Sequence, residues 1–219
     1  DKDETTLKKA ITKLGHGHGY FPIDVTEADA ANQAMLAAIQ KFGGLDILVS
    51  NAGAAHAGPM LSISNDELRN AFELNFFSHY SFSTEAAKIL KNQNRGGQIL
   101  FNISKQAVNP GKNFGAYGLP KATTFFLMRQ LALELGSDGI RVNGVNADRI
   151  RSGLLTDDFI SSRAKSRGVS ESEYMAGNLL GKEVTAEHVA DAFTSLACAE
   201  STTGHVMTVD GGNIEASLR

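Results

Sequence analysis

The sequence predicts an α/β protein built on a doubly wound parallel sheet, and two observations carry this prediction. Helical and strand-like patterns alternate along the chain, as they do when each parallel strand is followed by a crossover helix. The strand-like segments are short apolar runs, which are typical of strands buried on both faces. The 219 residues suit one domain with a sizeable core, so we expect residues 1–219 to form a single domain.

The elements can be followed in chain order. Apolar residues at helical spacing over 7–14 end in a glycine-rich turn, and Tyr20 to Val25 then indicate a short strand. A second helical pattern ends at Gly43, and Leu45 to Ser50 form an apolar strand. The alternation continues with a helix over 65–92, a strand over 98–103, a helix over 116–135, a strand over 140–145, a helix over 185–199 and a strand over 205–209.

Residues 152–184 interrupt this alternation with a polar, charged segment that contains helical patches. Long insertions beside the ligand edge of an α/β sheet often act as lids. We therefore expect this segment to border a substrate site.

Composition excludes several classes of function. The 21 Lys and Arg residues nearly balance 24 Asp and Glu residues, with a formal charge of −3, so we expect no nucleic-acid or anionic-membrane partner. No apolar run approaches the ~20 residues of a membrane span, and no basic-then-apolar leader opens the chain, which favours a cytoplasmic protein. His16 and His18 have no third ligand nearby in the sequence, and we expect no metal site.

Tyr117 and Lys121 form the pattern with the clearest chemical use. Their spacing of four residues at the start of a helix places both side chains on one face. A phenol has a pKa near ~10, which a neighbouring cation lowers, so Tyr117 is a candidate general acid/base. Taken alone, the same pattern also fits a surface tyrosine beside a solvated lysine.

Two other polar residues strengthen the chemical interpretation. Ser104 closes the strand over 98–103, thirteen positions before Tyr117, and a hydroxyl at the carboxyl edge of a parallel strand faces the ligand crevice. Asn75 lies upstream, within a predicted helix.

The sequence resembles the short-chain dehydrogenase/reductase family from about Asp24 to its end. The motifs that carry the resemblance are Ser50-Asn-Ala-Gly53, Asn75, Ser104, Tyr117-x-x-x-Lys121, Arg141-Val-Asn143 and Thr203-Gly-His-Val-Met-Thr-Val-Asp-Gly-Gly212. The resemblance implies a Rossmann-like fold and an NAD(P)-dependent oxidoreductase that interconverts a secondary alcohol or sugar hydroxyl and a carbonyl.

The same resemblance assigns roles to individual residues. Tyr117 is the general acid/base, Lys121 lowers its pKa and holds the nicotinamide ribose, Ser104 binds the substrate oxygen, and Asn75 fixes a proton-relay water. For the cofactor, NAD or NADP, the implied contacts are Asp24, Asn51, Ala52, Gly53, Tyr117, Lys121, Ile150 and Ser152. For Asn51 a hydrogen bond that stabilises the sheet is an equal alternative. The resemblance further implies a dimer or tetramer formed through the helices at 65–92 and 116–135, and a small hydroxylated or carbonyl substrate.

Three departures from the family pattern qualify this assignment. The glycine-rich turn of the pyrophosphate site does not occur, so we expect a fold that lacks the first β-α-β unit, with that unit upstream of Asp1 and the strand at Tyr20 to Val25 short of neighbours. Lys105 follows Ser104 where a second serine is usual, which leaves two registers for the catalytic hydroxyl. Asp148 replaces a glycine and brings a negative charge near the carboxamide site.

These departures leave two further hypotheses open. One is a catalytically inactive domain of the same fold that serves oligomerisation or scaffolding. The other is a narrower resemblance, to the dehydrogenase domain attached to rhamnulose-phosphate aldolases in bifunctional proteins. Neither the substrate nor the preference between NAD and NADP can be derived from these residues.

Overall fold

A computed structural model describes residues 1–213 and contains a four-stranded parallel sheet, which confirms the predicted α/β class. The strands are β1 (Ile47–Ser50), β2 (Gly97–Asn102), β3 (Ile140–Ala147) and β4 (Val206–Val209). They lie in the order β1-β2-β3-β4, and each neighbouring pair is parallel. All four carboxyl ends therefore meet at one edge of the sheet.

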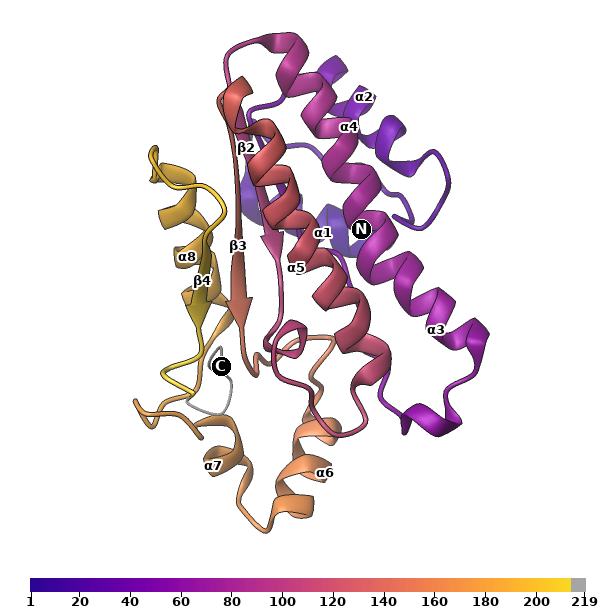
Figure 1. Cartoon of the computed structure of the whole chain (residues 1–219), viewed down its shortest axis with the longest axis vertical. Coiled ribbons are helices and arrows are strands. Elements are labelled where there is room, and N and C mark those ends of the chain that lie inside the picture. Colours follow the sequence, from indigo (N-terminus) through magenta and orange to yellow (C-terminus); the bar gives the residue numbers. More distant parts are fainter. Residues whose placement is uncertain (214–219) are drawn as a thin grey trace.

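Helices cover both faces of the sheet (Figure 1). On one face lie α4 (Ser78–Gln93) and α5 (Gly115–Leu135), which connect β1 to β2 and β2 to β3. On the other face lies α8 (Ala186–Cys198), in the connection from β3 to β4. This two-sided cover explains why the strands are apolar runs rather than alternating patterns.

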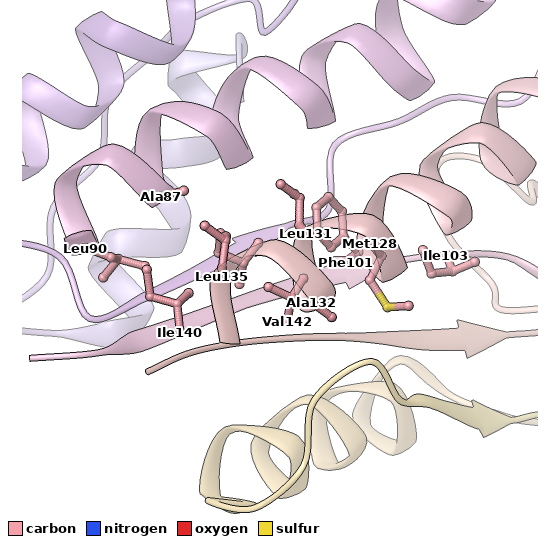
Figure 2. Packing of buried hydrophobic residues seen from close by; sticks show 11 residues of the cluster. Ala87, Leu90, Phe101, Ile103, Met128, Leu131, Ala132, Leu135, Ile140 and Val142 are labelled. Carbon is pink, nitrogen blue, oxygen red and sulfur yellow. The ribbon is translucent and has the colours of Figure 1, made fainter. Parts of the chain in front are cut away.

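The central strand β2 shows how the two layers are held together. Ile99 and Phe101 pack into the core that β2 and β3 form with α4 and α5 (Figure 2). Leu100 points the other way and packs with Leu196 of α8. Successive side chains of a strand alternate between faces, so β2 anchors both layers and fixes the sheet edge where its chain leaves.

The helical segment predicted over 65–92 is continuous but irregular. It comprises α3 (Asn65–Phe72), a π-helical turn η2 (Glu73–Phe77) and α4. Ser64 and Glu67 form a capping box that begins α3. A π turn widens the helix locally and is frequently found at functional sites, and this one holds Asn75.

The prediction of a strand at Tyr20 to Val25 is wrong. These residues have no strand geometry, and β1 is the edge of the described sheet on that side. A strand needs a partner for its backbone N–H and C=O groups, and Ile23 instead donates its N–H to the carbonyl of Asp1 (3.1 Å). The flanking helices α1 (Glu4–Leu14) and α2 (Ala30–Phe42) were expected and are present.

The polar segment 152–184 contains the expected helical patches, α6 (Asp157–Arg167) and α7 (Glu171–Met175). Both lie beyond the carboxyl ends of the strands (Figure 1). They have a small apolar cluster of their own, made of Leu155, Ile160, Ala164, Tyr174 and Met175. Within residues 1–213 no helix combines the length and apolarity needed to cross a bilayer.

Candidate active site

A cavity of about 370 Å³ lies where β2 and β3 end. Its walls come from the chain after β2, including the short 3-10 helix η3 (Lys105–Ala107), the start of α5, the chain after β3, and α6. Ser104, Tyr117, Ile150 and Ser152 all line it. Four residues proposed from separate stretches of the sequence are therefore brought to one cavity by the shared carboxyl edge of the strands.

Tyr117 is buried in the first turn of α5, at the wall of this cavity. Burial raises the pKa of its phenol, and a side-chain hydrogen bond with Ser104 partly opposes that rise. The expected lowering of this pKa by Lys121 is therefore wrong for this structure. The Lys121 ammonium lies 5.9 Å from the centroid of the Tyr117 ring and is directed to other partners.

Ser104 rather than Lys105 presents its side chain to Tyr117. The Ser104 hydroxyl also accepts a hydrogen bond from the backbone N–H of Gln106 (3.2 Å), which caps η3 and fixes the turn after β2. Lys105 instead pairs with Asp148. Of the two registers left open by the sequence, the geometry favours the hydroxyl of Ser104.

Lys121 is buried and is held by two acceptors. Its ammonium donates to the carbonyl of Asn102 (3.0 Å) and lies 3.4 Å from Nε2 of His79. Burial lowers the pKa of Lys121 to about 8. The lysine is thus fixed at the end of β2, one helical turn below Tyr117.

His79, on α4, is a residue that sequence reasoning missed. Burial, and then the charge of Lys121, lower its pKa to about 3, so its ring is neutral at physiological pH. With Nε2 facing an ammonium, the proton belongs on Nδ1, which lies 2.6 Å from the Ser50 hydroxyl. His79 therefore links Ser50 of β1 to Lys121. A single histidine within a helical pattern gives no sign of such a link in the sequence.

Asn75 and the loop after β1 pack directly against each other. The Asn75 side chain accepts from the N–H of Ala54 (3.2 Å) and donates to the carbonyls of Ala54 (3.0 Å) and Ala71 (3.1 Å). A Cβ at Gly53 would lie 2.8 Å from Oδ1 of Asn75 and 3.6 Å from Nζ of Lys121. Glycine is required here by this close approach rather than by backbone conformation.

The other expected cofactor residues lie outside the cavity lining. Asn51, Ala52 and Gly53 are exposed at the carboxyl end of β1. Asn51 accepts a hydrogen bond from the amide of Asn102 (2.7 Å). This bond joins the ends of β1 and β2, as in the alternative that Asn51 stabilises the sheet. Asp24 lies in a turn, where Thr26 and then Lys2 hold the pKa of its carboxyl at about 2.

Lys105 and Asp148, two departures from the family pattern, form an ion pair with each other. The side chain of Asp148 is only 5% exposed, and it also contacts Arg149 (3.2 Å) and the amide of Asn213 (2.6 Å). Burial tends to raise the pKa of Asp148, but Lys105, Arg149 and Asn213 outweigh it and the pKa is lowered. The expected negative charge is present, yet it is compensated by cations that the sequence did not connect to it.

Comparison with known proteins identifies the family of this chain. A family model described as enoyl-(acyl carrier protein) reductase matches residues 1–213. An uncharacterised oxidoreductase of Bacillus subtilis, YuxG, is 35% identical over 198 residues, which are 87% of this chain and 29% of that protein. L-2,3-butanediol dehydrogenase of Corynebacterium glutamicum is 29% identical over 88% of this chain and 77% of its own length.

Solved structures show the same fold. Acetoin dehydrogenase from Enterobacter cloacae superposes with a TM-score of 0.83 at 26% identity, over 98% of this chain and 84% of that one. A 3-ketoacyl-(acyl-carrier-protein) reductase from Brucella melitensis, solved with NADH, gives 0.87 at 24% identity, over 97% and 85%. The chain belongs to the short-chain dehydrogenase/reductase family, a family of oxidoreductases.

Proposed function

We propose that this chain catalyses the NAD(P)-dependent interconversion of a secondary alcohol or sugar hydroxyl and a carbonyl, with Tyr117 as the general acid/base. The observation that carries the proposal is the buried phenol of Tyr117, which lines a cavity at the carboxyl edge of the sheet together with Ser104. Family membership and the butanediol and acetoin dehydrogenases among its relatives support the same class of reaction.

The residues around the cavity fit the nicotinamide end of the cofactor. Lys121 is a buried donor next to Tyr117, Gly53 lets the loop after β1 lie against it, and Ile150 and Ser152 line the cavity. We assign these residues, with Asn51 and Ala52, to the nicotinamide and its ribose, and Asp24 to the adenine. When bound, the cofactor supplies or accepts the hydride.

Tyr117 and Ser104 manage the charge on the substrate oxygen. Because burial keeps the phenol protonated at neutral pH, Tyr117 acts as a proton donor during carbonyl reduction and takes the proton back during alcohol oxidation. The Ser104 hydroxyl donates to the same oxygen and stabilises its developing negative charge. To Asn75, whose side chain bonds to the loop after β1, we assign the water that returns protons from solvent.

A homo-oligomer is part of the proposal. Large apolar side chains on the outward surfaces of the η2–α4 segment and of α5 are exposed, namely Phe77, Tyr80, Leu119, Phe126 and Leu133. Exposed large apolar side chains gathered on two helices are typical of a protein interface. The two long helices therefore support a dimer or tetramer that buries them.

The proposal is tested with the protein that contains this chain and a panel of small carbonyls and alcohols that includes acetoin. Absorbance near ~340 nm reports the redox state of the nicotinamide. We expect turnover with NADH or NADPH, and a loss of about 10²–10³-fold in kcat for Ser104→Ala. Ser195→Ala, which removes an exposed hydroxyl on α8, is the matched control. No turnover and no binding of either dinucleotide by calorimetry would refute the proposal and favour a scaffolding domain.

A further inference from the structure

The lining of the cavity is strongly basic. Five cationic side chains line the cavity, and among its described lining residues Asp148 is the one carboxylate. The cationic residues are Lys105, Lys112, Arg149, Arg163 and Arg167. This excess of positive charge contrasts with a chain whose formal net charge is −3.

Two of these cations are already neutralised or saturated by the protein. Lys105 pairs with Asp148. Arg149 contacts the other oxygen of the same carboxylate and donates to the backbone carbonyls of Tyr174 and Gly177. Both oxygens of Asp148 are therefore occupied, and the carboxylate does not also neutralise Lys112, Arg163 or Arg167.

Arg163 and Arg167 have no carboxylate partner within residues 1–213. Each lies instead over an aromatic ring, Arg163 at 5.5 Å from the centroid of Phe114 and Arg167 at 5.2 Å from that of Tyr174. Stacking on a ring face orients a planar guanidinium and leaves its edge N–H groups free to bind a ligand. Both rings also line the cavity.

The Nε of Arg163 gives a second, independent observation. It is buried and has no hydrogen-bond acceptor within the described part of the chain. A buried donor without a partner destabilises the protein, and an acceptor brought by a ligand removes that cost. The cluster therefore combines excess positive charge with a buried N–H donor that an anionic acceptor could satisfy.

We propose that the substrate of this site carries an anionic group, a carboxylate or a phosphate ester, which Arg163 and Arg167 bind while its carbonyl or hydroxyl meets Tyr117 and Ser104. This inference rests on the oxidoreductase function proposed above. Arginine suits the role because its N–H groups match carboxylate and phosphate oxygens in pairs. A cavity of about 370 Å³ accommodates a small substrate with both groups.

Matched pairs of carbonyl substrates test the proposal directly. Acetoacetate is compared with methyl acetoacetate, and dihydroxyacetone phosphate with dihydroxyacetone, by kcat/KM in the wild-type protein. We expect at least one anionic member to exceed its neutral partner by about tenfold or more, because charge-assisted hydrogen bonds from two arginines to an anion contribute more than about 1.4 kcal/mol. The pair that shows the preference tells carboxylate from phosphate.

Variants of Arg163 and Arg167 test whether these residues cause the preference for the anionic substrate. Arg163→Met with Arg167→Met should abolish the preference for the anion while leaving kcat/KM for the neutral partner within about threefold. Lys165→Met is the matched control, since it removes one positive charge from the same helix at an exposed position outside the cavity lining. Should the double methionine variant fail to fold, Arg163→Lys with Arg167→Lys keeps the charge, and we expect a reduced but measurable preference.

The outcomes separate this inference from the proposed oxidoreductase function. Equal kcat/KM within both pairs, with acetoin also reduced, would overturn the anion site and leave the oxidoreductase intact. If no carbonyl is reduced, calorimetry with acetoacetate and with inorganic phosphate tests the anion site. Binding to the wild type that is lost in the double methionine variant supports the site, and no binding to the wild type refutes it. If the double variant weakens dinucleotide binding without changing the substrate preference, the arginines serve the cofactor and the proposal fails.

Discussion

The buried ammonium of Lys121 leads to a prediction about stability that does not depend on any substrate. Lys121 has two hydrogen-bond contacts and no carboxylate, and burial lowers its pKa from 10.5 to about 8. Between those values the unfolded chain binds a proton that the folded chain does not, so stability rises with pH across this window. The stability linked to Lys121 is fully present above about 10.5 and is lost as the pH falls toward 8.

The magnitude follows from the difference between the two pKa values. Each pKa unit corresponds to about 1.4 kcal/mol, so the wild-type protein should gain about 3 kcal/mol over Lys121→Met between pH 7 and pH 10.5. The contributions of the other titrating groups to the free energy of unfolding cancel when the variant is subtracted from the wild type. Tyr117 is among them, because its pKa shift arises from burial and Ser104 rather than from Lys121.

The assay is urea unfolding of both proteins, followed by far-ultraviolet circular dichroism, at several pH values from 7 to 10.5. Linear extrapolation gives the free energy of unfolding at each pH. A difference between the two proteins that stays constant within about 1 kcal/mol, or that shrinks with rising pH, would show that the ammonium of Lys121 is not desolvated as the structure indicates.

Other residues of the site give three more predictions. His79→Gln should resist acid better than the wild type, since burial lowers the pKa of His79 to about 3. Between pH 6.5 and 4, urea unfolding should show the wild type losing about 3 kcal/mol of unfolding free energy relative to the variant. Asp148→Asn should cost about 3 kcal/mol of unfolding free energy by leaving Lys105 without its partner, and Lys105→Met in the same protein should recover part of that loss. Gly53→Ala should weaken dinucleotide binding in calorimetry and destabilise the fold by about 1–3 kcal/mol, because its Cβ would meet Asn75.

The layers of the fold were predictable because they depend on local patterns. β2 and β3 are apolar runs flanked by helical patterns, which is the local signal of a buried parallel strand. The segment at Tyr20 to Val25 has the same local character but no partner strand beside it. Pairing is a tertiary property, and composition alone does not reveal its absence.

The site was only partly predictable for a similar reason. Ser104 and Tyr117 follow recognisable elements, so the shared edge of the sheet could be expected to bring them together. The pairing of Lys105 with Asp148 joins residues 43 positions apart, and neither residue signals the other in one sequence. The contact of His79 with Lys121 is likewise visible only once α4 and α5 are packed together.

The central claim is that the phenol of Tyr117 transfers the proton of the reaction. The most direct test is the rate of nicotinamide oxidation by acetoin, or by the best substrate of the matched pairs, in Tyr117→Phe and in the control Tyr20→Phe, whose hydroxyl lies outside the cavity lining. We expect the rate of Tyr117→Phe to fall by about 10²–10⁴-fold, with Tyr20→Phe unchanged. A rate for Tyr117→Phe within about threefold of the wild type would contradict the account.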